Sequence, residues 1–177
     1  MYYKLDTDRM ELTAFITQEE GPAMFRMREG QLYEMDPDEE GFSFSYEDEQ
    51  VPPLLDYIAG KCLMSRELVQ VLETAGVDNL QIFDAPLTDA ATGEINTGYR
   101  VVNVIGLVEA ADMDSSDSIP LGSGSVFTAL VIDTEKAQGL LMFRLAESRT
   151  DLIVHERVAD AITAGQFRGL TLTPVTD

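Results

Sequence analysis

Basic residues are scarce in this sequence. It contains 12 Lys and Arg against 32 Asp and Glu, a formal charge of −20 on 177 residues. Neither Lys nor Arg occurs between Arg28 and Lys61, or between Arg100 and Lys136. Because phosphate binding needs clustered cations, this distribution argues against nucleic acid as a direct ligand. The charge instead favours solubility or the fast capture of a positively charged partner.

Cysteine, histidine and tryptophan are also nearly absent. One Cys and one His cannot supply the usual ligands of zinc, and a single cysteine cannot form an internal disulfide. Cys62 lies in an apolar run, which is typical of a buried thiol rather than a nucleophile. His155 stands at the edge of another apolar run, which favours a capping or structural role over that of a general base. We therefore expect no catalytic residue, no metal and no cofactor.

Long apolar runs are missing too. No stretch approaches the ~18 apolar residues of a membrane span, and the first five residues lack the basic start of a secretory signal. With 45% hydrophobic residues, including six Tyr and eight Phe, the chain can still bury a sizeable core. We therefore expect one globular domain over residues 1–177, located in the cytoplasm and not at a membrane.

The first 53 residues are read as an acidic, strand-rich part that precedes the remainder at residues 54–177. Phe42, Phe44 and Tyr46 alternate with serines, which predicts a half-buried strand. A second strand is expected at residues 24–27, after a Gly-Pro turn. Residues 29–60 hold ten acidic residues and no basic one, yet apolar side chains are interspersed among them, so this is not a solvated tail.

Two segments of the sequence share one pattern. Each has apolar residues at helical spacing, then a glycine, a turn and a second apolar run. The helical positions are Leu68, Val71, Leu72 and Ala75 in the first segment, and Val158, Ala161, Ile162 and Gly165 in the second. Duplication and chance similarity of two common units both explain this pattern. The sequence therefore predicts two helix-to-strand units, which end near Pro86 and Pro174.

Residues with special backbone roles mark the ends of these units. Ser65 is a candidate N-cap, and Gly76 and Gly165 are candidate helix stops. Asn79 and Gly169 occupy the matching turn position, where a positive φ is expected.

Three further apolar runs, at residues 99–108, 126–133 and 140–145, are expected to be strands. Residues 133–139 form a short polar connection that suggests a hairpin, and residues 112–124 form a longer polar loop. Helices and strands do not alternate regularly, and no Gly-rich phosphate loop follows a strand. We therefore expect an α+β fold with short helices and a mixed or mainly antiparallel sheet, rather than a doubly wound fold.

Two short motifs near residues 112–125 carry little chemistry. Asp112, Asp114 and Ser116 follow the spacing of a calcium loop, but Asp117 replaces the turn glycine and Ser123 replaces the bidentate glutamate. A solvated loop is the better interpretation, with a looser cation site as the alternative. The glycines and serines at 122–125 do not match a nucleophile elbow, because Phe127 stands where the second glycine belongs.

The C-terminal half contains a series of apolar phrases. They are Ala129 to Asp133, Leu141 to Leu145, Leu152 to Val158, Phe167 to Leu170, and Pro174 with Val175, together with Val101 to Val104 and the opening Tyr2 to Leu5. This series resembles the immunity-protein family numbered eleven of bacterial polymorphic toxin systems, from about residue 54 onward. The resemblance implies an α+β fold and a non-enzymatic inhibitor that occludes a cognate toxin by tight binding.

That implied function agrees with the charge, because an acidic inhibitor can occupy a basic toxin cleft as a phosphate mimic. Exposed aromatics such as Tyr33 or Tyr46 are candidate hot spots, with the acids steering association. The alternatives are a carboxylate-rich cation-binding domain or enzyme, and a structural protein that binds another basic partner. The sequence leaves the oligomeric state open. The candidate partner-binding residues are Glu34, Asp36, Asp38, Glu39, Glu40, Glu47, Asp48, Glu49, Glu109, Asp112, Asp114 and Asp117.

Overall fold

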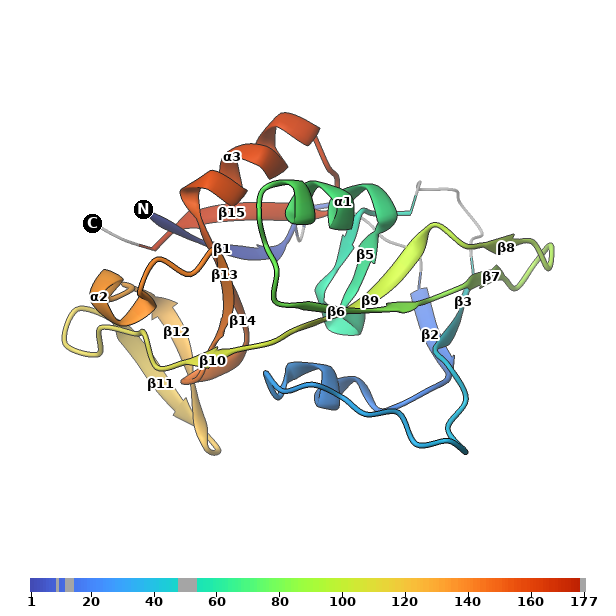
Figure 1. Ribbon diagram of the computed structural model, residues 1–177, viewed down its shortest axis with the longest axis horizontal. Coiled ribbons are helices and arrows are strands. Elements are labelled where there is room, and N and C mark those ends of the chain that lie inside the picture. Colours follow the sequence, from blue (N-terminus) through green and yellow to red (C-terminus); the bar gives the residue numbers. More distant parts are fainter. Residues whose placement is uncertain (9, 12–14, 48–53, 176–177) are drawn as a thin grey trace.

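The computed structural model describes residues 1–8, 10–11, 15–47 and 54–175. Within this part of the chain it has fifteen strands in four sheets, three short α-helices and two 3-10 helices (Figure 1). Most neighbouring strands are antiparallel, and the two parallel pairs are β10–β13 and β3–β7. The expected α+β fold with mainly antiparallel sheets is confirmed.

The largest sheet has five strands and combines the two ends of the chain. Its first strand lies between two strands from the C-terminal region, and the order is β10-β13-β14-β1-β15. The bounds are β1 (Tyr2–Thr7), β10 (Leu107–Val108), β13 (Met142–Leu145), β14 (Ser148–His155) and β15 (Leu170–Pro174).

A central four-stranded sheet has the order β4-β5-β9-β6. The 3-10 helix η2 (Ala59–Lys61) joins β4 to β5. The bounds of the strands are β4 (Tyr57–Ile58), β5 (Leu63–Ser65), β6 (Leu80–Asp84) and β9 (Tyr99–Val104).

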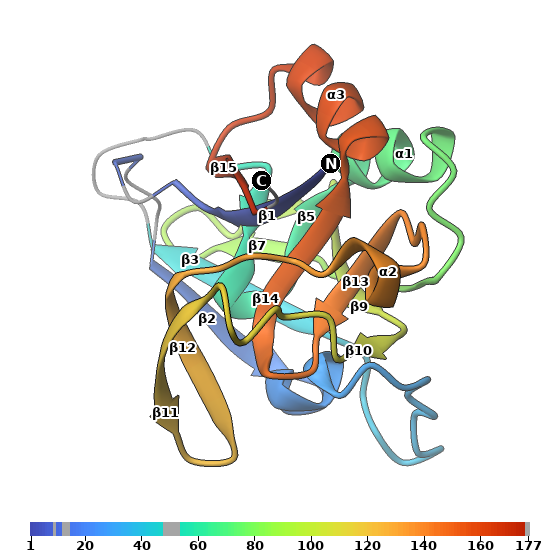
Figure 2. The ribbon, with the colours of Figure 1, turned by 90° about the vertical axis from the view of Figure 1, so that its left-hand side faces the viewer.

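The remaining strands form one four-stranded sheet, in the order β2-β3-β7-β8, and one separate hairpin. The four-stranded sheet contains β2 (Phe15–Glu20), β3 (Ser43–Glu47), β7 (Leu87–Asp89) and β8 (Ile95–Asn96). The β11–β12 hairpin, made of β11 (Asp117–Leu121) and β12 (Gly124–Ala129), extends away from the body of the molecule (Figure 2).

Both expected helix-to-strand units are present, and each is preceded by a strand. In the first, β5, α1 (Arg66–Thr74) and β6 follow one another, with β9 paired between the two strands. In the second, β14, α3 (Glu156–Gly165) and β15 follow one another, with β1 between the strands. The helices α1 and α3 pack against each other (Figure 1). Their inner faces join one hydrophobic core that includes Leu68, Leu72, Val158 and Ile162.

The helix caps occur at matching positions of the two units. The Ser65 side chain accepts a hydrogen bond from the Leu68 N–H at 3.2 Å, and His155 Nδ1 accepts one from the Arg157 N–H at 3.3 Å. Both side chains satisfy a donor that the first turn of a helix leaves without a partner. The expected capping roles are confirmed, and the single histidine has a structural use.

The turn positions are only partly as expected. Gly76 and Gly169 have positive φ, but α3 ends by placing Gln166, not Gly165, in the left-handed region. Asn79 does not have a positive φ. Its side-chain amide instead donates to the carbonyls of Ile105 and Met142 at 2.5 and 2.9 Å, which ties the central sheet to the five-stranded sheet.

One expected strand and one expected loop are wrong. Residues 24–28 form the 3-10 helix η1 (Met24–Arg28), in which Met24 and Met27 lie three residues apart and both pack inward. The expected polar loop at residues 112–124 contains β11, which pairs with β12 across a two-residue turn. Its sequence, Asp-Ser-Ile-Pro-Leu, does not alternate between polar and apolar residues, so the period-two pattern typical of a strand is missing.

The expected hairpin around residues 133–139 is also wrong. Asp133 caps the short helix α2 (Thr134–Ala137), since its side chain accepts from the Glu135 and Lys136 N–H groups. The strands on either side belong to different sheets, because β12 pairs with β11 and β13 pairs with β14. A capping aspartate at this position favours a short helix over a hairpin turn.

Candidate partner-binding surfaces

The first candidate surface is the acidic loop, defined here as residues 29–40, which has no helix or strand. The central sheet fixes its backbone. The Gln81 side chain accepts from the Tyr33 N–H and donates to the Tyr33 carbonyl, both at 2.8 Å. Asn103, which is fully buried, donates to the Gln31 carbonyl at 2.8 Å. These hydrogen bonds hold the acidic loop at a defined position next to β6 and β9.

Carboxylates of the acidic loop are held by local hydrogen bonds. Glu39 accepts from the Tyr33 hydroxyl and from the Asp36 N–H. These bonds lower the pKa of Glu39, and the same contact raises the pKa of Tyr33. The Arg26 guanidinium lies over the Tyr33 ring, 5.6 Å from its centroid.

A carboxyl pair joins the end of the acidic loop to β2. Glu40 and Glu20 are close enough to share a hydrogen bond, and this contact together with their like charge raises the pKa of Glu40. Both side chains are exposed. Two carboxylates held together at neutral pH repel each other, so a cation from a partner would relieve that repulsion at this point.

Exposed apolar residues accompany the acids, and sequence reasoning missed them. Phe25 is 62% exposed and Leu32 is 71% exposed, on either side of the start of the acidic loop. The expected hot-spot aromatics Tyr33 and Tyr46 are instead half-buried and pack against the core. The sequence contained no signal that separates these two groups, because all four are large side chains whose burial depends on which elements pack on them.

The second candidate surface is the acidic segment, defined here as residues 109–117, which leads into β11. Buried Ala110 and Ala111 anchor it, and the Asp112 N–H donates to the Val131 carbonyl at 2.9 Å. The Asp112 carboxylate accepts from the Asp114 N–H, the Ser115 N–H and the Ser115 hydroxyl. These bonds lower the pKa of Asp112, with the Ser115 hydroxyl as the largest cause.

The arrangement around Asp112 is that of a turn rather than a metal site. Its carboxylate is engaged by its own loop, which is the usual local use of an aspartate. In the part of the chain that the structure describes, no group of three or more His, Cys, Asp or Glu side chains is placed to hold a metal ion.

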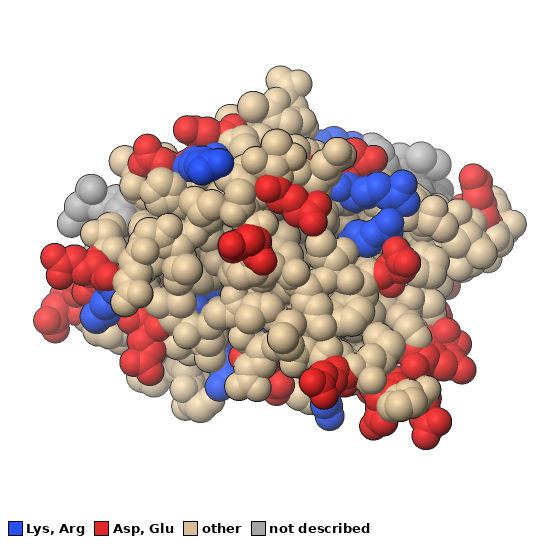
Figure 3. All heavy atoms as spheres, in the orientation of Figure 1, with Lys and Arg blue, Asp and Glu red and all other residues tan. Residues whose placement is uncertain are grey.

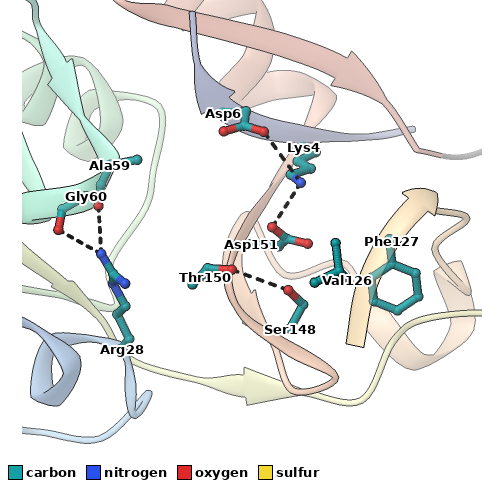
Figure 4. A pocket seen from close by; sticks show the side chains of 10 residues that line it. All are labelled: Lys4, Asp6, Arg28, Ala59, Gly60, Val126, Phe127, Ser148, Thr150 and Asp151. Carbon is teal, nitrogen blue, oxygen red and sulfur yellow. Dashed lines mark hydrogen bonds and ion pairs between the residues drawn. The ribbon is translucent and has the colours of Figure 1, made fainter. Parts of the chain in front are cut away.

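A cavity of about 330 Å³ lies between η1 and β12 (Figure 4). Lys4 bridges two carboxylates in it, 2.9 Å from Asp151 and 3.5 Å from Asp6. On the facing wall, the Arg28 guanidinium donates to the carbonyls of Ala59 and Gly60 at 3.2 and 2.9 Å. Among the described residues, no carboxylate forms a salt bridge with the Arg28 guanidinium. The two cations and two carboxylates that line the cavity have equal and opposite charge, so the cavity presents no free carboxylate pair.

The candidate residues thus fall on two separate surfaces. Acidic side chains gather at the lower right and at the left of Figure 3, where Figure 1 places the acidic loop and the acidic segment. The acidic loop and the β11–β12 hairpin both extend to the lower side of the molecule in Figures 1 and 2. Glu47 ends β3 and is exposed, outside the acidic loop. Asp48 and Glu49 lie outside the described residues.

Comparison with protein families decides the class of this chain. An immunity protein family, Imm11, matches residues 10–177. The chain belongs to the Imm11 immunity protein family. Among curated proteins, none matches its sequence. Membership implies a general toxin-inhibiting function and a toxin as partner, and it suggests a role without catalysis.

The match extends further toward the N-terminus than the expected resemblance, which began near residue 54. It includes the acidic loop as well as the acidic segment. The division of this Imm11 protein at residue 53 stays a prediction. Among its described helices, none is long and apolar enough to cross a membrane.

Proposed function

We propose that this Imm11 protein inhibits its cognate toxin by binding a basic surface of that toxin through the acidic loop and the acidic segment. The binding occludes the toxin surface and takes place in the cytoplasm. The observation that carries the proposal is the presentation of exposed carboxylates on two hydrogen-bonded backbones, the acidic loop and the acidic segment. Ordered carboxylates lose less entropy on binding than those of a mobile tail.

The expected electrostatics follow from the net charge of −20. A partner with a basic surface is attracted over about one Debye length, roughly 8–10 Å at physiological salt, so association is fast and depends on salt. The Glu20–Glu40 pair adds a point where a toxin Lys or Arg relieves like-charge repulsion. Charge of this kind contributes mainly to association rate and specificity.

The test is calorimetry with the toxin domain encoded beside this chain, at low and at physiological salt. We expect tight binding that weakens with salt and abolishes the toxin's activity. The triple variant Glu34→Gln, Asp36→Asn, Asp38→Asn should bind more weakly and with a flatter salt dependence. Glu39 is left unchanged because it orders the loop.

The matched control changes three carboxylates on and beside the helices at the opposite side of the molecule: Glu73→Gln, Asp78→Asn and Asp160→Asn. It alters the net charge by the same amount. Equal effects of the two triples would contradict a specific acidic surface and leave only a general charge effect. Absence of binding by the unchanged protein would contradict the proposed function itself.

A further inference from the structure

The β11–β12 hairpin has one apolar face that is exposed. Ile119 lies opposite Val126, and Leu121 lies opposite Gly124. Side chains of opposed residues, and of residues two apart on one strand, point to the same face of a β-ribbon. Ile119, Leu121 and Val126 therefore share a face, and their exposed fractions are 62%, 68% and 47%.

The hairpin holds this face in a fixed position. Gly122 has a φ of +62° at the first position of the two-residue turn, as a type II′ hairpin turn requires. Next to the turn, the Ser125 N–H donates to the Glu147 carbonyl at 2.7 Å. Phe127 packs against the core of the five-stranded sheet. Phe127 thus anchors the hairpin, while the core does not need the exposed Ile119 and Leu121.

We propose that this apolar face is the main energetic anchor for the cognate toxin, seated against an apolar patch that is bordered by basic residues. The inference rests on the proposed function and names the surface that carries most of the binding free energy. Apolar side chains that become fully buried at the centre of an interface dominate affinity, while surrounding charges contribute less.

Charge complementarity points to a basic partner. Four carboxylates stand directly before or at the start of β11, and no Lys or Arg occurs between Arg100 and Lys136. Lys136 is within 3.6 Å of the Asp133 carboxylate. Arg149 and Glu147 both line the groove beside Leu121 and Val126, so a partner seated on the hairpin meets an apolar strip whose net negative charge lies at its base. The carboxylates are Glu109, Asp112, Asp114 and Asp117.

A second copy of this chain fits the face poorly. Two hairpins packed face to face would bring two copies of the acidic segment together, each on a molecule of charge −20. Three exposed side chains are also far from the roughly 800 Å² per partner that a stable interface buries. The toxin can add contacts with other surfaces of the molecule, whereas hairpin-to-hairpin packing cannot.

The contact uses the face of the hairpin and not the edge of β11. Ser125 N–H points away from β11, toward Glu147, so the opposed residue Pro120 directs its backbone away from β12. Proline has no N–H, so the outer edge lacks a donor at this position. Addition of a toxin strand to β11 is therefore disfavoured.

The test compares Ile119→Ser with Ile95→Ser in calorimetry and in association and dissociation kinetics with the toxin. Ile95 lies on β8 and is 59% exposed, close to the 62% of Ile119, so it is a matched control. The double variant Ile119→Ser, Leu121→Ser should weaken binding at least about 30-fold. The loss should lie in faster dissociation with the salt dependence unchanged, because no charge is removed.

The outcomes separate the two proposals. Binding by the unchanged protein with no loss in the hairpin variants overturns the hairpin inference and leaves the proposed function standing. Absence of binding by the unchanged protein overturns both. If sedimentation shows a dimer that the double variant converts to a monomer, the face binds a second copy and the inference is wrong. The single variant Leu121→Asn, at a 68% exposed site, replaces the double variant if the latter fails to fold.

Discussion

The Gln81 side chain makes with Tyr33 the two hydrogen bonds that a neighbouring strand would make. Its Oε1 accepts from the Tyr33 N–H and its Nε2 donates to the Tyr33 carbonyl, each at 2.8 Å. Gln81 Oε1 also accepts from buried Asn103 at 3.0 Å. One side chain thus connects the acidic loop to the central sheet without adding a strand.

Gln81→Leu should lower the free energy of unfolding by about 1–3 kcal/mol, because it leaves partly buried backbone groups of Tyr33 without partners. Urea unfolding measures this loss, and hydrogen exchange at the Tyr33 N–H should become faster. Gln70→Leu is the control, since Gln70 is exposed on α1. Equal stability of the two variants would mean that the acidic loop is held by other contacts.

Glu40 and Glu39 should respond to the same substitution with opposite signs. The raised pKa of Glu40 means that the folded protein keeps this proton to higher pH than the unfolded chain. Its stabilising contribution is therefore lost as pH rises through the folded pKa, and Glu40→Gln should stabilise the protein at pH 7. The lowered pKa of Glu39 gives a contribution that is present at pH 7 and lost as pH falls, so Glu39→Gln should destabilise it.

Urea unfolding at pH 7 and at pH 3 measures both effects, which should become smaller at the lower pH. We further expect Glu40→Gln to weaken toxin binding while it stabilises the free protein, because a partner's cation loses its paired carboxylates. Changes of the same sign in both variants would show that the Glu20–Glu40 contact does not strain the folded state.

The two helix caps should differ in their cost. Ser65→Ala should lower the free energy of unfolding by about 1 kcal/mol, the usual value for a lost N-cap. His155→Ala should cost more, because His155 also packs edge-on against the Tyr2 ring at 5.3 Å. Thermal unfolding measures both, and Ser123→Ala in the exposed hairpin turn is the control. A larger loss for Ser65 than for His155 would contradict this order.

Gly169→Ala tests the turn between α3 and β15. Gly169 has a φ of +80°, and an added Cβ would lie 2.5 Å from the Leu55 Cβ. Gly93 has a similar φ of +73° with no atom within 4 Å of an added Cβ. Gly93→Ala should therefore cost only the backbone strain, about 1–3 kcal/mol, and Gly169→Ala clearly more. Similar unfolding midpoints would mean that Leu55 moves aside freely.

The strand–helix–strand units were partly predictable from the sequence because their signals are local. Apolar spacing placed α1 and α3, and Ser65 stood where an N-cap belongs. Pairing of β9 and β1 inside these units joins residues far apart in the chain, and no local pattern encodes it. The class of fold could therefore be inferred, but not its sheets.

The positions of the acids were evident in the sequence, whereas the apolar part of each surface was not. Ile119 and Leu121 flank Pro120 in a short run without polar–apolar alternation, so the sequence predicts a loop and gives no local sign of a strand with an apolar face. Phe25 likewise gives no local sign that it faces solvent. Whether an apolar face is covered depends on which elements pack on it, and this is settled only when the whole chain has folded.

The position of β1 between β14 and β15 has a consequence for folding. These partners are synthesised long after β1, so a ribosome releases the first strand well before either neighbour exists. Closure of so long a loop is entropically costly and slows folding relative to local contacts. Until β14 and β15 have been synthesised, Leu5 lacks its strand partners Leu152 and Leu172, and chaperones have time to bind this strand. Inhibition of the toxin must therefore lag behind translation of the immunity protein.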